Sequence, residues 1–185
     1  MRPSFRRVLS GFVGTLVFST NSDADGIPFG AFDVPTVFFI SKSDDRNRVD
    51  YGMRLDQRCD PVTAEPVFPY WREFERSPPV RTHSLGMFEW MAYGIAEQRV
   101  VRRTAIGSTT VVTLKQVRRP ISITTHKDVS GRCAALGTMT IAGSEGAELV
   151  SVYVKLAGFL SVEYVKVVGK DPKTGLPVEE RLHGR

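Results

Sequence analysis

Turn-forming residues interrupt this chain at short, regular intervals, and that spacing is the strongest limit on its fold. From residue 34 to residue 168, turn signals built on glycine, proline and short polar clusters recur roughly every 8–15 residues. Most segments between them are rich in β-branched residues, with little intervening helical pattern. A parallel sheet needs a long crossover after each strand, so this spacing argues against repeated βαβ units. We expect an all-β protein, a single antiparallel β-barrel or β-sandwich domain of about 7–9 strands with one short helix.

Residues 48–56 show the clearest strand pattern, because Val49, Tyr51 and Met53 alternate with charged residues such as Asp50. A period of two predicts a half-buried strand whose charged side chains face solvent. Pro69 has no N–H group, so it places its aromatic-rich segment on an edge strand or a bulged strand. The other predicted strands are residues 34–41, 67–74, 94–103, 109–117, 120–125, 132–141, 148–157 and 160–168.

One segment, residues 84–93, has a helical pattern. Ser84 is a suitable N-cap, and Leu85, Phe88 and either Met91 or Ala92 fall on one stripe of the helix. For the end of the chain, from residue 169, we expect a turn followed by a polar tail. The chain contains no internal repeat and no linker, so we expect residues 25–185 to form a single β-rich domain.

The N-terminal segment has the three parts of a secretory signal peptide. Arginines precede an apolar stretch at residues 8–18, and small residues around Ala24 follow it. We therefore expect residues 1–24 to be a signal peptide and the remaining domain to be periplasmic or secreted. In the alternative interpretation, residues 8–18 form an edge strand or a short helix of the fold. No apolar run approaches the roughly 18–20 residues of a spanning helix, so we expect no membrane-spanning segment.

The chain has two cysteines, Cys59 and Cys133. An even pair in an exported protein predicts a disulfide bond, and closing so long a loop would stabilise the fold by roughly 4 kcal/mol. Their separation excludes the close spacing of redox and zinc-ribbon motifs. If the protein is not exported, both cysteines are expected to be buried free thiols.

Four segments together resemble a bacterial family known as domain of unknown function 4833. They read VPTVFFISKSDDRNRVDYGMRLD, PVFPYWREFE, MAYGIAEQRV and SVYVKLAGFLSVEYVKVVGKDPKTGLPVEE, and they extend the resemblance over about residues 34–182. The resemblance implies a single domain. It brings no established activity, cofactor or catalytic residue to this chain, and it lowers the expectation of a standard enzyme.

The sequence shows no catalytic or metal-binding motif. It lacks a G-x-S-x-G elbow, an H-E-x-x-H pair, a P-loop and a G-x-G-x-x-G turn, and its three histidines are isolated from one another. We therefore predict no catalytic residue, metal site or cofactor. We expect a protein that is not an enzyme, and an enzyme is the alternative. An enzyme would need a site assembled only by the fold, with Tyr51, His83, Glu89 and Tyr93 as its candidate residues.

Positive charge is concentrated between residues 98 and 127, where seven cationic residues occur without any acidic residue. A hairpin through residues 105–108 would gather several of these charges on one ribbon, which is typical of an anion-binding surface. In the alternative interpretation they form a solvated edge that blocks edge-to-edge aggregation. Nucleic acid is not the expected partner, because aromatic residues are not interleaved with the basic ones. The predicted anion-binding residues are Arg99, Arg102, Arg103 and Arg119.

Four aromatic residues, Tyr70, Trp71, Trp90 and Tyr93, are candidates for an apolar binding site. In the alternative interpretation, they pack the helix against the sheet. The combined prediction is an exported binding or interaction module for an apolar or anionic envelope ligand. A ligand-free structural subunit, which would expose an apolar patch, is the first alternative, and a hydrolase-type enzyme is the second.

Overall fold

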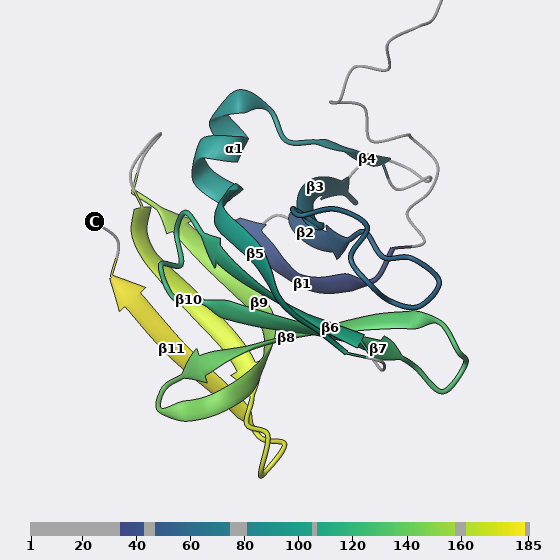
Figure 1. Ribbon diagram of the computed structural model, residues 1–185. Coiled ribbons are helices and arrows are strands. Elements are labelled where there is room, and N and C mark those ends of the chain that lie inside the picture. Colours follow the sequence, from purple (N-terminus) through teal and green to yellow (C-terminus); the bar gives the residue numbers. More distant parts are fainter. Residues whose placement is uncertain (1–33, 43–46, 75–80, 105–106, 158–161, 184–185) are drawn as a thin grey trace, which may run out of the picture.

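The computed structural model describes residues 34–42, 47–74, 81–104, 107–157 and 162–183. The predicted signal peptide lies outside these residues. The described chain forms strands and one short helix, so the expected all-β class is confirmed (Figure 1). The elements are β1 (Thr36–Lys42), β2 (Arg48–Met53), β3 (Val67–Glu73), β4 (Arg81–Ser84), α1 (Met87–Tyr93), β5 (Ile95–Thr104), β6 (Gly107–Leu114), β7 (Ile121–Lys127), β8 (Cys133–Ile141), β9 (Ser144–Leu156), β10 (Val162–Lys170) and β11 (Pro177–His183).

The strands belong to one strongly curved sheet of 11 strands, more than the sequence predicted (Figure 1). Its main path runs β4-β3-β2-β1-β9-β8-β7-β6-β5, and β10 and β11 branch from β9. Strand β9 belongs to the main path and also carries the branch. It is 13 residues long, which is enough for two strands to pair one after the other along one of its edges. One of its edges pairs with β8 and then with β1, while the other pairs with β10. The β1–β9 pair is parallel and the other pairs are antiparallel, so the expected purely antiparallel sheet is wrong at this one point.

The sheet curves until its two ends approach each other, but no described strand pairing closes it. Strand β5, at one end of the path, contacts β3, which is second from the other end. The contact is made by a side chain, because Gln98 of β5 bonds to the backbone of Val67 in β3. The structure is therefore a single open sheet that curves toward closure.

Apolar residues of successive strands fill the interior of the curved sheet. The alternation predicted for β2 is present, since Val49, Tyr51 and Met53 are fully buried. Phe38 stacks on Tyr51, with ring centroids 4.5 Å apart. Burial of such side chains, each contributing roughly 1.5–3 kcal/mol, is the main source of stability. The other strands contribute Ile40, Val112, Leu114, Ile121, Ile123, Ile141, Leu149, Val152, Val154, Val165 and Val167.

The opposite face of β2 is not solvated as its charge pattern predicted. Asp50 is fully buried, and its carboxylate lies 2.6 Å from Nε of Arg48 and 2.7 Å from Nε of Arg72. Arg72 comes from β3, where it is the register partner of Arg48. A buried carboxylate is tolerated when charged donors surround it. Asp50 is therefore buried, although its charge predicted a solvent-exposed side chain.

Two strands, β4 and β11, were not predicted from the sequence. The polar tail expected after residue 169 is wrong, because β11 pairs antiparallel with β10 along its whole length. It has only two core contacts, Val178 and Leu182, and its remaining residues are mostly charged. Strand β4 is four polar residues long and pairs with the second half of β3. Pro69 precedes the half of β3 that pairs with β4. The edge of β3 that faces β4 is therefore unpaired at Pro69, which has no N–H group to donate.

Helix α1 is shorter than predicted and buries only part of the predicted stripe. Ser84 ends β4, and the helix is instead capped at Gly86, whose N–H donates to the Glu89 carboxylate at 2.6 Å. Leu85, Ala92 and Tyr93 face the core. In the described part of the chain, no helix is long and apolar enough to cross a membrane. The stripe predicted to face the core is confirmed at Leu85 and at Ala92, the alternative to Met91, and is wrong at Phe88. Helix α1 exposes Met87, Phe88, Trp90 and Met91.

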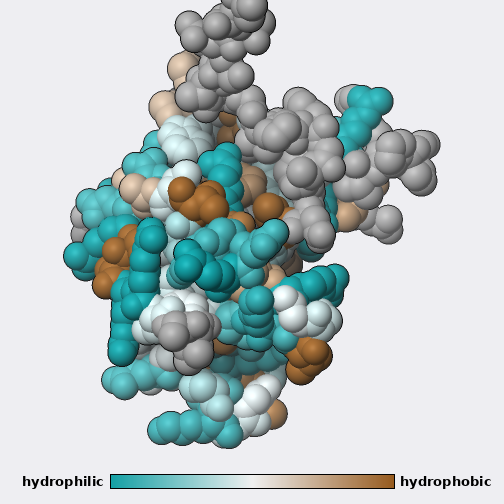
Figure 2. Space-filling model, turned by 45° about the vertical axis from the view of Figure 1, so that its right-hand side comes forward, coloured by the Kyte–Doolittle hydropathy of each residue, from teal (hydrophilic) through white to brown (hydrophobic). Residues whose placement is uncertain are grey.

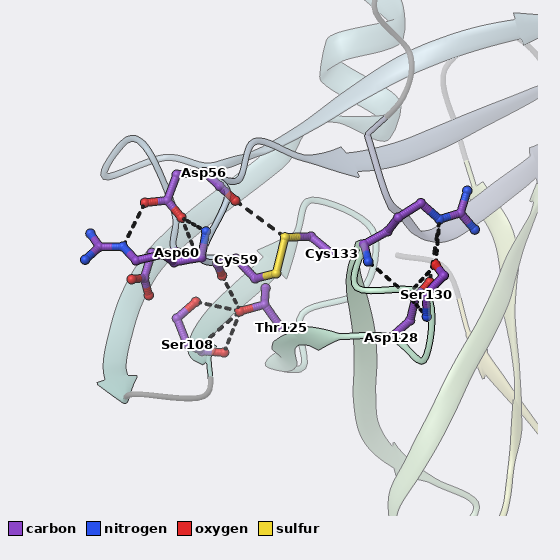
Figure 3. The surroundings of a disulfide bond; sticks show 10 residues. Asp56, Cys59, Asp60, Ser108, Thr125, Asp128, Ser130 and Cys133 are labelled. Atoms are coloured by element: carbon purple, nitrogen blue, oxygen red, sulfur yellow. Dashed lines mark hydrogen bonds and ion pairs between the residues drawn. A yellow bond between two sulfur atoms is a disulfide. The ribbon is translucent and has the colours of Figure 1, made fainter.

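The predicted disulfide is present and ties the β2–β3 loop to the start of β8 (Figure 3). Cys59 is fully buried, and its carbonyl oxygen accepts a 2.7 Å hydrogen bond from the Thr125 hydroxyl of β7. The Asp56 carboxylate accepts the backbone N–H groups of Arg58 and Asp60 and holds the turn around the cysteine. Two distant parts of the sheet path are thereby joined at one end of the molecule.

Candidate functional site

The outer edge of β5 has no strand partner among the described residues. Its inner edge pairs with β6 in the predicted hairpin, and its outer edge faces Ala64, Glu65 and the start of β3 across a gap that we call the seam. At one end of this seam, the Gln98 carboxamide accepts from Val67 N at 3.0 Å and donates to Val67 O at 3.1 Å. At the other end, an Arg103 Nη lies 3.4 Å from the Pro61 carbonyl oxygen. Side chains, not a backbone ladder, bridge the seam at these two points.

A groove of about 550 Å³ lies between the two bridges. We call it the β5 groove, and it is lined by Ala64, Glu65 and residues 98–103. A second hollow of about 550 Å³ shares Glu65, Gln98 and Arg99 with it and continues toward β6. The groove therefore runs along the strand instead of ending in a closed cavity.

Three of the four predicted anion-binding arginines line the β5 groove. Arg99, Arg102 and Arg103 are exposed, and none makes an ion pair with a described carboxylate. A break in the β5–β6 register between Val100 and Arg102 leaves Val101 unpaired and 47% exposed. Bulges of this kind re-aim side chains at sheet edges. The groove has a cationic rim, a partly apolar floor and one acidic residue, Glu65.

The fourth predicted residue, Arg119, is committed to another contact. Its guanidinium binds the Glu180 carboxylate of β11 through two bonds of 2.7 Å. This pairing raises the pKa of Arg119 and, with the Ala142 N–H, lowers the pKa of Glu180. The fork geometry fixes β11 against the β6–β7 connection. Arg119 therefore does not line the β5 groove with the other three arginines.

The four predicted aromatic residues differ in burial. Tyr70, Trp71 and Tyr93 are buried, and Trp71 meets Tyr93 edge to face with centroids 6.1 Å apart. The Tyr51 hydroxyl donates to the Tyr93 carbonyl, and burial raises the pKa of Tyr51 well above its usual value. The contacts of Trp71 and Tyr51 with Tyr93 join α1 to the sheet, whereas Tyr70 contacts Phe68 and Arg72 within the sheet. Trp90 is 43% exposed.

The residues considered for an enzyme have structural contacts. Tyr51 and Tyr93 form the buried contact just described, and Glu89 caps α1. His83 lies 3.4 Å from the Glu73 carboxylate across the β3–β4 pair and also contacts the Ser84 carbonyl. No trio of His, Cys, Asp or Glu within the described ranges has an arrangement suited to a metal ion.

A third hollow, of about 650 Å³, is lined in part by Cys133 of the disulfide. Two carboxylates in its lining accept hydrogen bonds from residues of their own turns. Asp56 accepts backbone N–H groups of its loop, and Asp128 accepts hydrogen bonds from Ser130 and Arg132. These hydrogen bonds lower the pKa of both aspartates. Two acidic and two cationic residues line this cavity, whereas three arginines and one glutamate line the β5 groove.

Sequence reasoning found the arginines but missed the residues that make the groove. Gln98 and Glu65 carry no motif, and a glutamine amide that bonds to a strand 31 residues away leaves no local signal. Figure 2 shows one face of the molecule, largely hydrophilic with small, separate hydrophobic patches. The fold and this geometry define a single-sheet all-β protein with a cationic groove at its open seam.

The comparisons place this fold in a family. The family described as Domain of unknown function (DUF4833) matches residues 38–181, which is more than half of the chain. The chain therefore belongs to this family, as the resemblance of its segments indicated. No curated protein and no solved structure matches it.

Proposed function

We propose that this chain is an exported binding module whose β5 groove binds an anionic component of the cell envelope. The observation that carries the proposal is the group of three exposed arginines along one groove, without an ion-pair partner among the described residues. Cationic side chains gathered in a concave site attract anions and orient them. The ion pair of Arg119 removes that residue from the proposed set.

Two features support export. The N-terminal sequence has the three parts of a signal peptide. The Cys59–Cys133 disulfide joins parts of the chain 74 positions apart, and such bonds persist mainly in oxidising compartments. Intact-mass measurement of the protein from its own host tests this. Loss of residues 1–24 and of two hydrogens is expected, whereas a full-length reduced chain would contradict export.

Binding is tested with two anionic probes, polygalacturonate and phosphatidylglycerol vesicles, at low and at physiological salt. Replacing Arg99, Arg102 and Arg103 together with glutamine should weaken binding at least about tenfold, and salt should weaken the wild type. The matched control removes the same charge at three exposed cations outside the groove: Arg118→Gln, Lys170→Gln and Lys173→Gln. Equal loss in both triple variants would show nonspecific attraction and contradict the proposal.

A second candidate function, a structural subunit of an envelope assembly, is favoured by helix α1. The helix exposes Met87, Phe88, Trp90 and Met91, although monomers seldom expose large apolar patches. Lys115 of the neighbouring segment lies 5.7 Å from the Trp90 ring centroid. Analytical ultracentrifugation tests this function. A concentration-dependent oligomer that Trp90→Lys dissolves would favour the subunit, whereas a monomer at all concentrations would favour the binding module.

A further inference from the structure

The Gln98 side chain acts as a hydrogen-bond partner for the backbone of β3. Its carboxamide exchanges both a donor and an acceptor bond with the backbone of Val67. Two residues opposite each other in an antiparallel pair exchange bonds in the same way. One amide group of β5 therefore satisfies the backbone of β3 at a point where the two strands do not pair.

The two bridges limit where an added chain could lie along β5. At the Gln98 end, Cα atoms of β3 and β5 approach within 8 Å, which is less than the two spacings of about 4.8 Å that an intervening strand would need. The Arg103 contact with the Pro61 carbonyl bridges the other end. Between the bridges, the described residues include no backbone hydrogen bond to the outer edge of β5. This stretch of β5 therefore has a strand edge that an added chain could pair with.

The length of the groove also suits an extended chain. From Gln98 to Arg103 the strand advances five residues, or roughly 17 Å at about 3.3 Å each. The opposite wall, Ala64 and Glu65, is exposed and belongs to no strand. Proteins that bind extended segments at a sheet edge gain affinity from backbone hydrogen bonds and specificity from alternate side chains.

We infer that the β5 groove accepts an extended acidic segment of a partner protein as an additional strand on β5. The three arginines on its rim determine the charge of the segment, and Val101 with Ala64 offers contacts to smaller apolar side chains. The inference rests on the proposed function, because it names the anion as a peptide. It replaces the interpretation of these arginines as a guard against edge-to-edge pairing.

The test uses a fluorescein-labelled octapeptide of alternating glutamate and valine, with fluorescence anisotropy of the full disulfide-bonded protein. Two control peptides of the same charge carry N-methyl groups on the odd or on the even residues, which removes the strand hydrogen bonds on one side. The unmodified peptide should bind, one N-methylated peptide should bind at least tenfold more weakly, and the other should bind nearly as well. Hydrogen exchange should slow at residues 99–103.

The outcomes separate this inference from the proposed function. If both N-methylated peptides bind as the unmodified one does, and the Arg99, Arg102 and Arg103 variant binds none, the groove binds anions but not as a strand. Binding of polygalacturonate or vesicles without binding of the peptide likewise overturns only the strand. Slowed exchange confined to β4 or β11 overturns the location. If no probe distinguishes the arginine variant from its charge-matched control, both proposals fail.

Discussion

Removal of the disulfide should lower the stability of this protein by an amount that its loop length determines. The bond joins residues 74 positions apart. On the chain-entropy relation, opening a loop of that length gives the unfolded chain about 4.5 kcal/mol of additional conformational freedom at 25 °C. Cys59 has a positive φ of 67°, and alanine retains its Cβ, so the backbone strain there is the same before and after Cys59→Ala.

The assay is thermal unfolding of three samples, followed by circular dichroism: the oxidised wild type, the reduced wild type, and Cys59→Ala with Cys133→Ala. For a domain of this size, 1 kcal/mol shifts Tm by roughly 2–4 °C, so a fall of about 10–15 °C is expected. Reductant should leave the double variant unchanged, which serves as the control. A fall below about 3 °C would refute the reasoning, because it would mean that Thr125 and the turn at Asp56 hold the loop without the bond.

Three further changes test other parts of the structure. Gln98→Leu should cost roughly 2–4 kcal/mol in urea unfolding, because it leaves the buried N–H and C=O of Val67 unpaired. Asp50→Asn should cost about 3 kcal/mol, because two partly buried arginines lose their shared carboxylate. Ser144 and the turn N–H groups lower the pKa of Asp171 from 3.8 to about 2. Its contribution is therefore full above about pH 4 and is lost as the pH falls toward 2, so Asp171→Asn should flatten stability against pH in that window.

Each of these expectations has an outcome that contradicts it. Equal unfolding midpoints for Gln98→Leu and the wild type would mean that water satisfies Val67 without the bridge. A loss below about 1 kcal/mol in Asp50→Asn would mean that solvent screens the two arginines. An unchanged pH profile in Asp171→Asn would assign the acid sensitivity to other carboxylates, of which Glu180, held by Arg119, is the next to test.

The features that depend on neighbours along the chain were predictable from the sequence. The alternation of Val49, Tyr51 and Met53 assigned one buried face of β2, because successive side chains of a strand point to opposite sides. Turn residues located most of the strands, and three cationic residues within five positions of β5 identified the charged ribbon. The cysteine pair indicated the disulfide, since only two cysteines are present. Each of these features follows from a local sequence pattern or, for the cysteines, from the fact that two cysteines allow only one pair.

The features that depend on distant partners were decided by the tertiary structure. Arg119 pairs with Glu180, 61 positions away, and this contact separates it from the other predicted arginines. Asp50 is interior because Arg72 of the next strand reaches it. The β5 groove exists because Gln98, not a strand, bridges the last gap of the sheet. Local periodicity specifies which way a side chain points, whereas its partner depends on where the folded chain brings another segment.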